Sequence, residues 1–362
     1  MTEWKEYKLG EIVTFQRGHD LPKDKMIDGD IPVAGSNGII GYHNQFTKEG
    51  PGVTIGRSGN IGIPHYYPNA YWAHNTVLYV VDFKGNDAKF MYYLLKTFDF
   101  TQLNTGSAVP SLNRNHIHEL PVSIPDVPTQ HRIAAILSSL DDKIDLLHRE
   151  NATLEQMAET LFRQWFVVEA KEEWEEGKLG DEFTFTMGQS PSGDSFNEEG
   201  IGIPMYQGNA DFGFRFPTKR VFTTQPTRFA EPNDTLISVR APVGAQNMAT
   251  EKCCIGRGVA AFRYRKNPAL YSYTYYKLKS LLEEIKQFND NGTVFGSISK
   301  SDFENLDIMI PDNETIKMFQ KQVKVIDDKI INNNNEIQTL IQTRDGLLPK
   351  LMSGEVKIES RK

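Results

Sequence analysis

Two long stretches of the chain carry apolar residues at alternating steps of three and four, which is the spacing of helices that pack along a narrow seam. These positions run through residues 133–165 and recur 186 residues later, in 319–351. Nine of ten positions are apolar in the first stretch and eight of ten in the second, the exceptions being Asn151, Asn333 and Arg344. Each helix of some 35 residues would be about 50 Å long.

Such helices pack either on their own domains or against each other. A seam this long and narrow exceeds the surface of one small domain, so we expect the two helices to pair. Only about eight residues, 167–174, separate the first helix from the segment that follows it. A parallel pair would need a longer return linker, so we predict an antiparallel pair.

The polar seam positions predict the register of this pair. If Asn151 faces Asn333, all ten layers pair, with Leu147 against Ile337. A shift of one heptad would leave each amide buried without a partner, at about 1–3 kcal/mol apiece. We therefore predict a buried Asn151–Asn333 layer at the centre; the alternative is that both residues face water at a frayed seam. Pro349 is expected to interrupt the last turns of the second helix.

The residues that precede each helix have a different texture. Short apolar runs such as TVLYVV and DTLISV alternate with Gly, Pro and Asn, which predicts β-rich domains with long loops. Residues 104–126 align without a gap with 290–312, and residues 4–18 align with 174–188 at an offset of 170. Loops of different length explain the change of offset. The chain is therefore predicted to be an internal duplication.

This organisation predicts an α+β protein in which two duplicated β-rich domains are separated by two long helices. The helices are expected to form an antiparallel coiled coil with pseudo-two-fold symmetry. The expected segments are a first domain, a first spacer helix, a second domain, a second spacer helix and a C-terminal tail, at 1–126, 127–168, 169–312, 313–354 and 355–362.

Composition narrows the functional classes. The chain has 362 residues, of which 39 % are hydrophobic, enough for two domains with cores. The net charge of −7 argues against nonspecific coating of nucleic acid, although 40 Lys and Arg can still cluster on one surface. No run of 18 apolar residues occurs, so we expect a cytoplasmic protein. Cys253 and Cys254 are adjacent and supply neither a framework disulfide nor a zinc set.

The sequence lacks a recognisable catalytic constellation. There is no GxxxxGK[ST] motif, and the glycines of 56–62 precede a strand-like run, which favours a turn over a dinucleotide site. His116 and His118 have Asp302 and Glu304 as repeat counterparts and no third ligand in view. We expect no metal site and interpret them as surface residues. These absences favour a binding protein.

Several stretches resemble the specificity (S) subunit of Type I restriction-modification enzymes. They read WKEYKLGEIVTFQRG, GSAVPSLNRNHIHELPVSIPDVPTQHRIAAILSSLDDKID with its copy, LEQMAETLFRQWFV and LLPKLMSGEV, and together span nearly the whole chain. The resemblance implies two target recognition domains that each read one half of a bipartite DNA sequence. It also implies that the two helices act as a ruler and as a docking site for methyltransferase subunits. The second copy departs from the family pattern at PDNETIKMFQ, where the family usually shows a Pro-rich entry followed by Glu-Gln.

The same resemblance implies a non-catalytic subunit that directs DNA methylation and defence against foreign DNA. Its partners would be double-stranded DNA, two methyltransferase (M) subunits and two restriction (R) subunits, with no membrane. The chain itself would bind no cofactor; S-adenosylmethionine, ATP and Mg would belong to the partners. One alternative is a self-contained DNA methyltransferase, although the [DNS]PP[YF] motif is missing. The other is a coiled-coil adaptor without a DNA role.

Cations that recur in both copies are candidates for contact with DNA phosphates. The sequence pairs Arg57 with Arg240, and Arg114 with Lys300. A local bridge to a carboxylate is the alternative for each of them.

Loops supply the other DNA-binding candidates. Ser107 and Thr293 lie in matched glycine-containing loops that suit phosphate, with a structural turn as the alternative. Base contacts are expected where the copies differ, because different half-sites need different side chains. The loops that differ are 17–25, 36–45, 188–196 and 208–220, and their cationic candidates are Lys23, Lys219 and Arg220.

An Asp-Asp-Lys triplet recurs on the two helices. Its members are Asp141, Asp142 and Lys143 in the first copy and Asp327, Asp328 and Lys329 in the second. The triplet lies off the seam, where helix packing alone does not retain it. Its retention suggests that the same partner docks on each helix; a favourable pattern of helix charges is the alternative.

Overall fold

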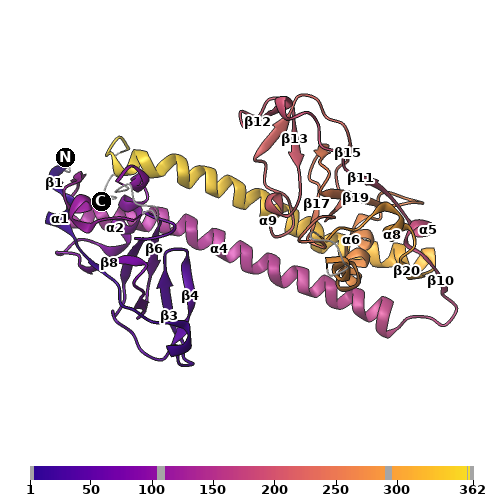
Figure 1. The fold of residues 1–362 in the computed structure, drawn as a ribbon, viewed down its shortest axis with the longest axis horizontal. Coiled ribbons are helices and arrows are strands. Elements are labelled where there is room, and N and C mark those ends of the chain that lie inside the picture. The colour runs from indigo at the N-terminus through magenta and orange to yellow at the C-terminus, as the bar shows by residue number, and fades with distance from the viewer. Residues whose placement is uncertain (1–3, 104–110, 290–295, 357, 359–362) are drawn as a thin grey trace. The chain divides into compact units, whose positions relative to one another are not determined.

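The computed structural model describes residues 4–103, 111–289, 296–356 and 358. The chain divides into two compact units. Unit 1 comprises Met1–His148 and Asn334–Lys362, and unit 2 comprises Arg149–Asn333. The division falls inside both long helices, because each unit joins one β-rich domain to one end of each helix (Figure 1).

The two long helices lie where the heptad pattern predicts them. Helix α4 spans Val127–Arg163 and continues as a π-helical turn over Gln164–Val168, and helix α9 spans Asn313–Met352. An aspartate precedes each of them. The Asp126 carboxylate accepts the Thr129 N–H at 3.1 Å, and the Asp312 carboxylate accepts the Thr315 N–H at 2.8 Å. These caps satisfy amides of the first turn, so the second helix begins normally despite its unusual entry sequence.

Pro349 does not end α9, contrary to the prediction. It lies in the last turns, where its missing N–H removes a single backbone hydrogen bond. The N–H of Ser353 still donates to the carbonyl of Pro349 at 2.9 Å. The helix therefore continues through the proline to Met352. None of the described helices combines the length and the apolar character that a membrane crossing requires.

The β-rich domain of unit 1 contains a four-stranded sheet of order β2-β8-β5-β6, a three-stranded sheet of order β4-β3-β7, and an antiparallel β1–β9 pair. Short helices connect these strands. The bounds are β1 Lys5–Lys8, α1 Leu9–Ile12, β2 Thr14–Arg17, η1 Lys23–Lys25, β3 Ile31–Gly35, β4 Gly38–His43, β5 Gly52–Gly56, β6 Pro64–Tyr67, β7 Trp72–Ala73, β8 Val77–Asp82, α2 Ala88–Leu95, η2 Phe100–Leu103, α3 Arg114–His118 and β9 Pro121–Ile124.

The β-rich domain of unit 2 contains a four-stranded sheet of order β11-β19-β16-β17, a five-stranded sheet of order β12-β14-β13-β18-β15, and an antiparallel β10–β20 pair. The bounds are β10 Glu175–Lys178, α5 Leu179–Glu182, β11 Phe183–Met187, η4 Gly193–Ser195, β12 Phe196–Asn197, β13 Ile203–Tyr206, η5 Asn209–Asp211, β14 Val221–Thr223, β15 Phe229–Ala230, β16 Thr235–Ser238, β17 Gln246–Met248, β18 Cys253–Ile255, β19 Val259–Tyr264, α6 Tyr271–Ser280, α7 Leu282–Lys286, η6 Gln287–Asn289, α8 Lys300–Glu304 and β20 Asp307–Ile310.

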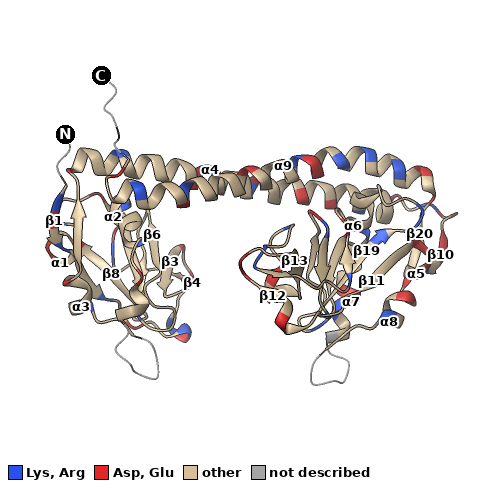
Figure 2. Ribbon diagram, turned by 90° about the horizontal axis from the view of Figure 1, so that it is seen from above, with Lys and Arg blue, Asp and Glu red and all other residues tan. Residues whose placement is uncertain are grey.

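The two domains repeat one arrangement, which confirms the predicted duplication. Strands β2-β8-β5 of unit 1 and β11-β19-β16 of unit 2 are joined in the same order and are antiparallel throughout. The closing pairs also match: Lys8 lies opposite Pro121, and Lys178 lies opposite Asp307. The second sheets differ in strand number. In each unit the β-rich domain lies along one side of its helix ends (Figure 2).

The core of each unit includes side chains from both long helices. In unit 1, Phe90 packs in one buried cluster with Leu137 of α4 and Leu351 of α9. In unit 2, Phe162 of α4 and Phe319 of α9 meet edge to face, with ring centroids 5.6 Å apart. Fully burying one such side chain contributes about 1.5–3 kcal/mol. The helix ends thus belong to the domain cores as well as to the helix pair.

The helices pair with the predicted register. In unit 2 the Asn333 side chain donates a hydrogen bond to the Asn151 side-chain oxygen at 2.9 Å, and both residues are at most 3 % exposed. In unit 1 Leu147 and Ile337 share one buried cluster with Ile144. Residues that ascend along α4 meet residues that descend along α9, so the helices are antiparallel in each unit. The alternative of a frayed seam with asparagines facing water is wrong.

Candidate nucleic-acid interface

Three chain segments converge at one end of the main sheet of unit 1. The N–H of Gly18, which follows β2, donates to the carbonyl of Val77 at 3.0 Å. The N–H of Arg57, which follows β5, donates to the carbonyl of Thr76 at 2.8 Å. The loops after β2 and β5 and before β8 are therefore held side by side, together with the end of β2 at Arg17.

Two arginines at this sheet end, Arg17 and Arg57, form no close ion pair with a carboxylate among the described residues. Arg57 Nη1 donates to the carbonyl oxygen of Asn75 at 3.4 Å, and Arg17 lies 3.9 Å from the carboxylate of Asp20. Burial lowers the pKa of the Arg57 guanidinium, and the nearby charge of Arg17 lowers it further. An external anion would relieve this repulsion. Guanidinium groups arranged this way suit a phosphate, which each can bind in bidentate fashion.

Further hydrogen-bonding side chains lie beside these arginines. His19 Nε2 is 3.2 Å from the hydroxyl of Tyr79, and His74 Nδ1 is 3.0 Å from the hydroxyl of Thr76. Burial lowers the pKa of His74 below its usual 6.5, so its ring is neutral at pH 7. A neutral imidazole has one donor and one acceptor, which suits contact with a base edge.

The same sheet end in unit 2 is built from equivalent backbone bonds and carries different side chains. The N–H of Gly188 donates to the carbonyl of Val259 at 2.9 Å, as Gly18 does in unit 1. Arg240 and Arg257 are exposed at this end, and Arg228 is exposed just before β15 of the neighbouring five-stranded sheet. The carbonyl of Arg228 accepts a hydrogen bond from the end of β18, and the N–H of Arg257 donates to a serine hydroxyl at 3.3 Å.

Sequence comparison missed Arg17, Arg228 and Arg257. None of them has a basic counterpart in the other copy, so a search for repeated cations passes over them. The GRG sequence at 256–258 was the available indication, because glycines on both sides of an arginine are typical of a tight, exposed turn.

The structure corrects one predicted equivalence. Ser111 and Ser297 are repeat counterparts, and each forms an isolated antiparallel bridge, to Ser58 in unit 1 and to Arg240 in unit 2. Arg240 is therefore equivalent to Ser58, not to Arg57. Side chains alternate between faces along an extended chain, so this shift of one residue changes the environment. Arg57 is half-buried, whereas Arg240 is exposed.

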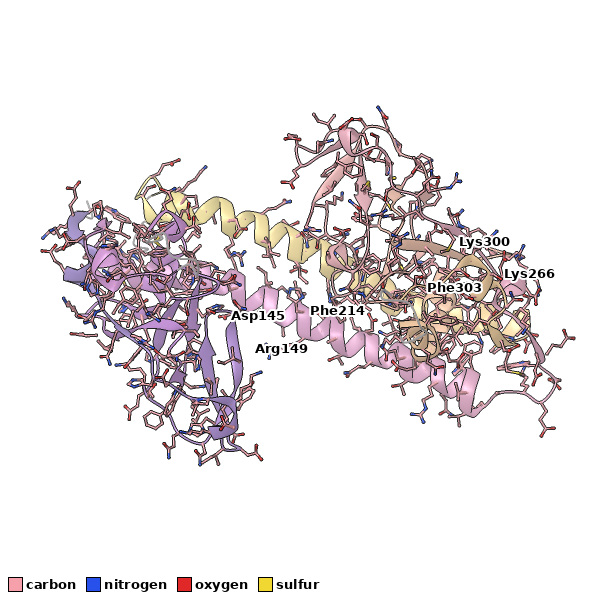
Figure 3. The ribbon with its side chains drawn as sticks, viewed as in Figure 1. Asp145, Arg149, Phe214, Lys266, Lys300 and Phe303 are labelled. Carbon is pink, nitrogen blue, oxygen red and sulfur yellow. The ribbon has the colours of Figure 1, made fainter. Side chains whose placement is uncertain are left out.

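Arg114 and Lys300 are equivalent, since they begin the matching helices α3 and α8. Both are exposed, and Figure 3 labels Lys300. Lys300 Nζ lies 3.3 Å from the Glu304 carboxylate, so the alternative of a local bridge applies to this lysine. Ser107 and Thr293 lie outside the described residues. A role of Arg114 in phosphate contact stays a prediction.

The candidate cations of the variable loops differ in their surroundings. Lys23 is exposed in η1. Lys219 pairs with the carboxylate of Glu251, and Arg220 Nη2 lies 2.6 Å from the carboxylate of Asp211, whose hydrogen bond raises the pKa of the guanidinium. These two ion pairs already neutralise the side chains. Arg220 therefore helps to close its own loop, and contact with DNA by Lys23, Lys219 and Arg220 stays a prediction.

The first aspartate of each Asp-Asp-Lys triplet contacts a side chain of its own unit. Its recurrence in both copies therefore does not require a partner subunit. Asp141 accepts a hydrogen bond from the hydroxyl of Tyr93 at 2.6 Å and pairs with Arg344 at 2.8 Å. Asp327 accepts a hydrogen bond from the hydroxyl of Tyr276 at 3.2 Å. In each copy this aspartate holds its own β-rich domain through a tyrosine, which offers a structural reason for its recurrence, and partner binding there stays a prediction.

The lysines of the triplets join the two helices. Lys143 lies 3.3 Å from Glu336 in unit 1, and Lys329 lies 3.4 Å from Glu150 in unit 2. The 186-residue offset carries one pair onto the other, so they are equivalent interhelical ion pairs. Of the remaining two members, Asp142 is exposed, whereas Asp328 is half-buried, pairs with Lys324 and accepts a hydrogen bond from the hydroxyl of Tyr271 in α6 at 3.5 Å. Partner binding at these two positions stays a prediction.

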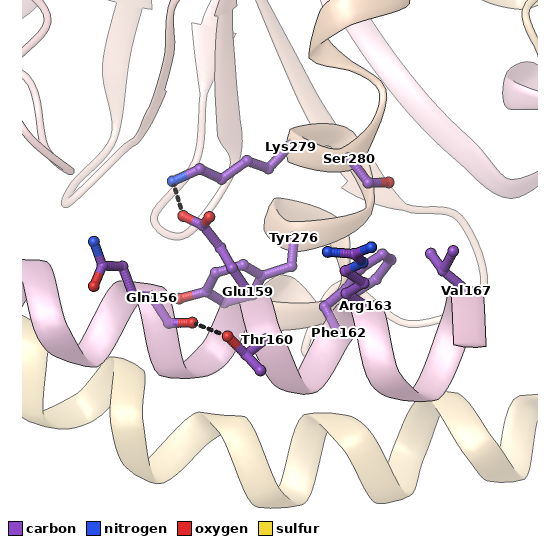
Figure 4. A pocket seen from close by; sticks show the side chains of 9 residues that line it. All are labelled: Gln156, Glu159, Thr160, Phe162, Arg163, Val167, Tyr276, Lys279 and Ser280. Carbon is purple, nitrogen blue, oxygen red and sulfur yellow. Dashed lines mark hydrogen bonds and ion pairs between the residues drawn. The ribbon is translucent and has the colours of Figure 1, made fainter. Parts of the chain in front are cut away.

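A cavity of about 580 Å³ lies in unit 2 between α4 and α6 (Figure 4). Its wall carries Lys279, which pairs with Glu159 at 2.5 Å, and the hydroxyl of Thr160. Phe162 and Val167 supply its apolar part.

Comparison with known proteins adds to this description. The family model described as "Type I restriction modification DNA specificity domain" matches residues 1–156 and again 171–343. The chain is 32 % identical over 266 residues to the putative type I restriction enzyme MjaX specificity subunit of Methanocaldococcus jannaschii, covering 69 % of this chain and 62 % of that relative, which is less than two thirds of its length.

A second relative is matched along its whole length. The type I restriction enzyme HindI specificity subunit of Haemophilus influenzae is 23 % identical over 471 residues, covering 98 % of this chain and 100 % of the relative. The crystal structure of a Type-I restriction-modification system S subunit from M. genitalium matches with a TM-score of 0.65 at 19 % identity, covering 99 % of this chain and 97 % of that one. That likeness shows a shared fold.

Proposed function

Because the chain belongs to the Type I restriction modification DNA specificity domain family, we propose that it selects the DNA target of a Type I restriction-modification enzyme. One observation carries the proposal: the same sheet end occurs twice and carries different side chains in each copy. Unit 1 has Arg17 and Arg57 there, and unit 2 has Arg240 and Arg257. Two equivalent surfaces with different side chains suit two different DNA half-sites.

The two helices complete this mechanism as a ruler. Each of them runs from one unit into the other, and a continuous helix resists bending over its length. Two domains joined in this way would accept half-sites only at a fixed separation, on the order of one helical turn of DNA, about 34 Å. The bases between the half-sites would then be unread, which gives a bipartite target with a constant gap.

The chain acts in this proposal without chemistry of its own. Two methyltransferase subunits would supply S-adenosylmethionine chemistry, and two restriction subunits would supply the ATP- and Mg-dependent steps. The methyltransferase subunits would dock on the helix surface around Asp142 and Asp328, and the protein would act on DNA in the cytoplasm. The carboxylates of Asp141 and Asp327 bind tyrosines of their own units.

Co-expression with a methyltransferase subunit, followed by genome-wide mapping of methylated bases, tests the proposal. The expected result is a two-part motif with a constant gap. Replacing residues 1–125 with those of a relative should change one half of the motif and leave the other unchanged. Methylation at unchanged sites after this replacement would favour a coiled-coil adaptor without a DNA role.

The rival class, a self-contained DNA methyltransferase, requires a separate measurement. Titration calorimetry with S-adenosylmethionine and the isolated chain is expected to show no stoichiometric binding. Clear binding at one molecule per chain would contradict the proposal and favour the enzyme.

A further inference from the structure

Arg215 of unit 2 is a buried cation that joins the β-rich domain to both long helices. It lies in the loop between η5 and β14, and its side chain is 1 % exposed. Nη2 lies 2.8 Å from the carboxylate of Asp327 on α9, and Nη1 lies 3.4 Å from the carboxylate of Glu155 on α4. An arginine is rarely buried this far unless ion pairs hold it, and here two helices provide the anions.

Helix α6 closes this cluster. The guanidinium carbon of Arg215 lies 3.3 Å from the ring centroid of Tyr275, a distance at which cation–π attraction is strong. The Tyr275 hydroxyl also donates to Glu155 at 3.2 Å, and Lys279 pairs with the same carboxylate. Arg215 thus pairs with Asp327 and Glu155, and Lys279, whose side chain is 29 % exposed, pairs with Glu155 and Glu159. Removing Arg215 alone would leave the buried carboxylate of Asp327 without a counter-charge.

In unit 1 the aspartate equivalent to Asp327 has a different counter-charge. There Asp141 pairs with Arg344, which belongs to α9 itself, so the ion pair joins helix to helix. The 186-residue offset carries position 344 onto Ala158 of α4, a buried residue with no polar group. The small side chain of Ala158 leaves the pairing of Asp327 to a residue from outside the helices, and Arg215 supplies it. The ion pair of unit 2 therefore joins domain to helix.

Backbone hydrogen bonds link Arg215 to the strands that lead to the candidate DNA-binding sheet end. The carbonyl of Arg215 accepts the N–H of Met248 in β17 at 2.9 Å. The side chain of Asn247, also in β17, donates to the carbonyl of Gly213 at 2.9 Å and accepts its N–H at 3.1 Å. Strand β17 pairs with β16, and Arg240 lies two residues beyond the end of β16. The helices are therefore connected to β16 through Arg215 and β17, and to Arg240 through the two residues of backbone that follow β16.

We propose that Arg215 is a positioning residue that fixes the second recognition domain on the helix pair and thereby sets discrimination at the half-site that this domain reads. The inference rests on the proposed function. Without Arg215 the domain keeps its fold, but its sheet end is presented at a less defined angle to the helices. Mismatched bases in the second half-site are then tolerated better, while the first half-site is read as before.

The test compares two charge-balanced variants of the full chain in complex with a methyltransferase subunit. The test variant R215M/D327N removes one buried cation and one buried carboxylate together, and Glu155 keeps its ion pair with Lys279. The control variant R344M/D141N removes the equivalent ion pair of unit 1. Thermal unfolding of each complex gives a temperature at which both are folded. Competition binding then uses duplexes with the mapped motif and duplexes with one mismatched base pair in either half-site.

A single mismatch usually costs about 1–3 kcal/mol, so the loss of discrimination is measurable, and we expect a reduction of about tenfold for the test variant. The reduction should be confined to the half-site that does not change when residues 1–125 are replaced. The control variant should keep full discrimination there. A folded test variant with unchanged discrimination at both half-sites, or an equal loss at both, would overturn the role of Arg215. A wild-type complex without any bipartite preference would overturn the proposed function itself, and this inference with it.

Discussion

The side-chain amide of Asn333 donates a hydrogen bond of 2.9 Å to the side-chain oxygen of Asn151, and both residues are buried. The 186-residue offset carries this layer onto Leu147 and Ile337, which form an aliphatic layer. One of two equivalent layers is therefore polar. A buried asparagine pair in a mainly aliphatic seam favours one register, because any other leaves the amides unpaired.

Replacing one of these asparagines should destabilise the protein. Asn333→Leu is expected to lower the free energy of unfolding by about 1–3 kcal/mol, because the amide of Asn151 would stay buried without a partner. The double variant N151L/N333L should recover most of this loss, since both polar groups are then absent. Urea denaturation followed by circular dichroism measures the difference.

Asn332→Leu, an exposed position of the same helix, is the matched control and should change stability by less than about 0.5 kcal/mol. Equal stability of N333L and wild type would contradict the role of this layer.

Arg57 should contribute to DNA binding through a phosphate. Arg57→Gln is expected to weaken binding for all sequences alike and to reduce the slope of log affinity against log salt by about one. Fluorescence anisotropy of the complex with labelled duplex over a series of salt concentrations measures both quantities. Lys8→Gln provides the control, because Lys8 is an exposed cation of the same unit that pairs with Glu119. If Arg57→Gln and Lys8→Gln give the same slope as wild type, Arg57 makes no phosphate contact.

Two equivalent glycines should be required at the sheet ends. A Cβ atom at Gly18 or at Gly188 would lie closer than 3.0 Å to backbone oxygens of the neighbouring loop. G18A and G188A are each expected to displace that loop and weaken DNA binding by about tenfold, equivalent to ~1.4 kcal/mol. A Cβ at Gly193 has no atom within 4 Å, so G193A should bind as wild type does. Anisotropy titrations of the three variants test this, and normal binding by G18A and G188A would rule out a tight loop approach.

Glu182 should make stability depend on pH. Glu182 is 4 % exposed, and its carboxylate accepts a hydrogen bond from the hydroxyl of Tyr273 at 2.8 Å. Burial raises the pKa of this carboxyl from 4.5 to about 7, although the charge of Lys277 opposes the rise. Between these two pH values the folded protein holds a proton that the unfolded chain has released. Stability contributed by Glu182 is therefore present below pH 4.5, falls as the pH rises toward 7, and is constant above it.

The variant E182Q should lack this dependence. The difference in the free energy of unfolding between E182Q and wild type is expected to increase in favour of E182Q between pH 4.5 and about 7. The increase is about 1.4 kcal/mol per pH unit and at most about 3 kcal/mol in total. The repeat counterpart, Ile12, shows that an uncharged side chain is compatible with this position of the fold. Urea denaturation of both proteins at several pH values provides the measurement. Parallel stability curves for E182Q and wild type would show that Glu182 is ionised in the folded protein.

The helices and their register were predictable from the sequence because a heptad repeat is a local pattern that persists over many turns. The two polar positions then left one register in which both amides have a partner. The duplication was predictable for a similar reason, since matched stretches such as 104–126 and 290–312 align without gaps.

Contacts between distant segments were not predictable in this way. The inward orientation of Asp141 and Asp327 depends on Tyr93 and Tyr276, which lie in helices of the β-rich domains, and helical spacing does not reveal them. Arg215 is one arginine in an irregular loop, and no periodic pattern marks it. The error of one residue at Arg57 arose because matching identical residues ignores the hydrogen-bond register of the strands, which only the folded sheet defines.

Asp141 pairs with an arginine of α9, whereas Asp327 pairs with an arginine of the β-rich domain, and this difference has a consequence for gene recombination. A foreign domain joined ahead of α4 has to offer Asp141 only a hydroxyl in the place of Tyr93, because α9 brings its own Arg344. A foreign domain inserted between α4 and α9 also has to bring a guanidinium, or two carboxylates stay buried without a counter-charge. We therefore expect new specificities to arise more readily by exchange at the 5′ end of this gene than in its middle.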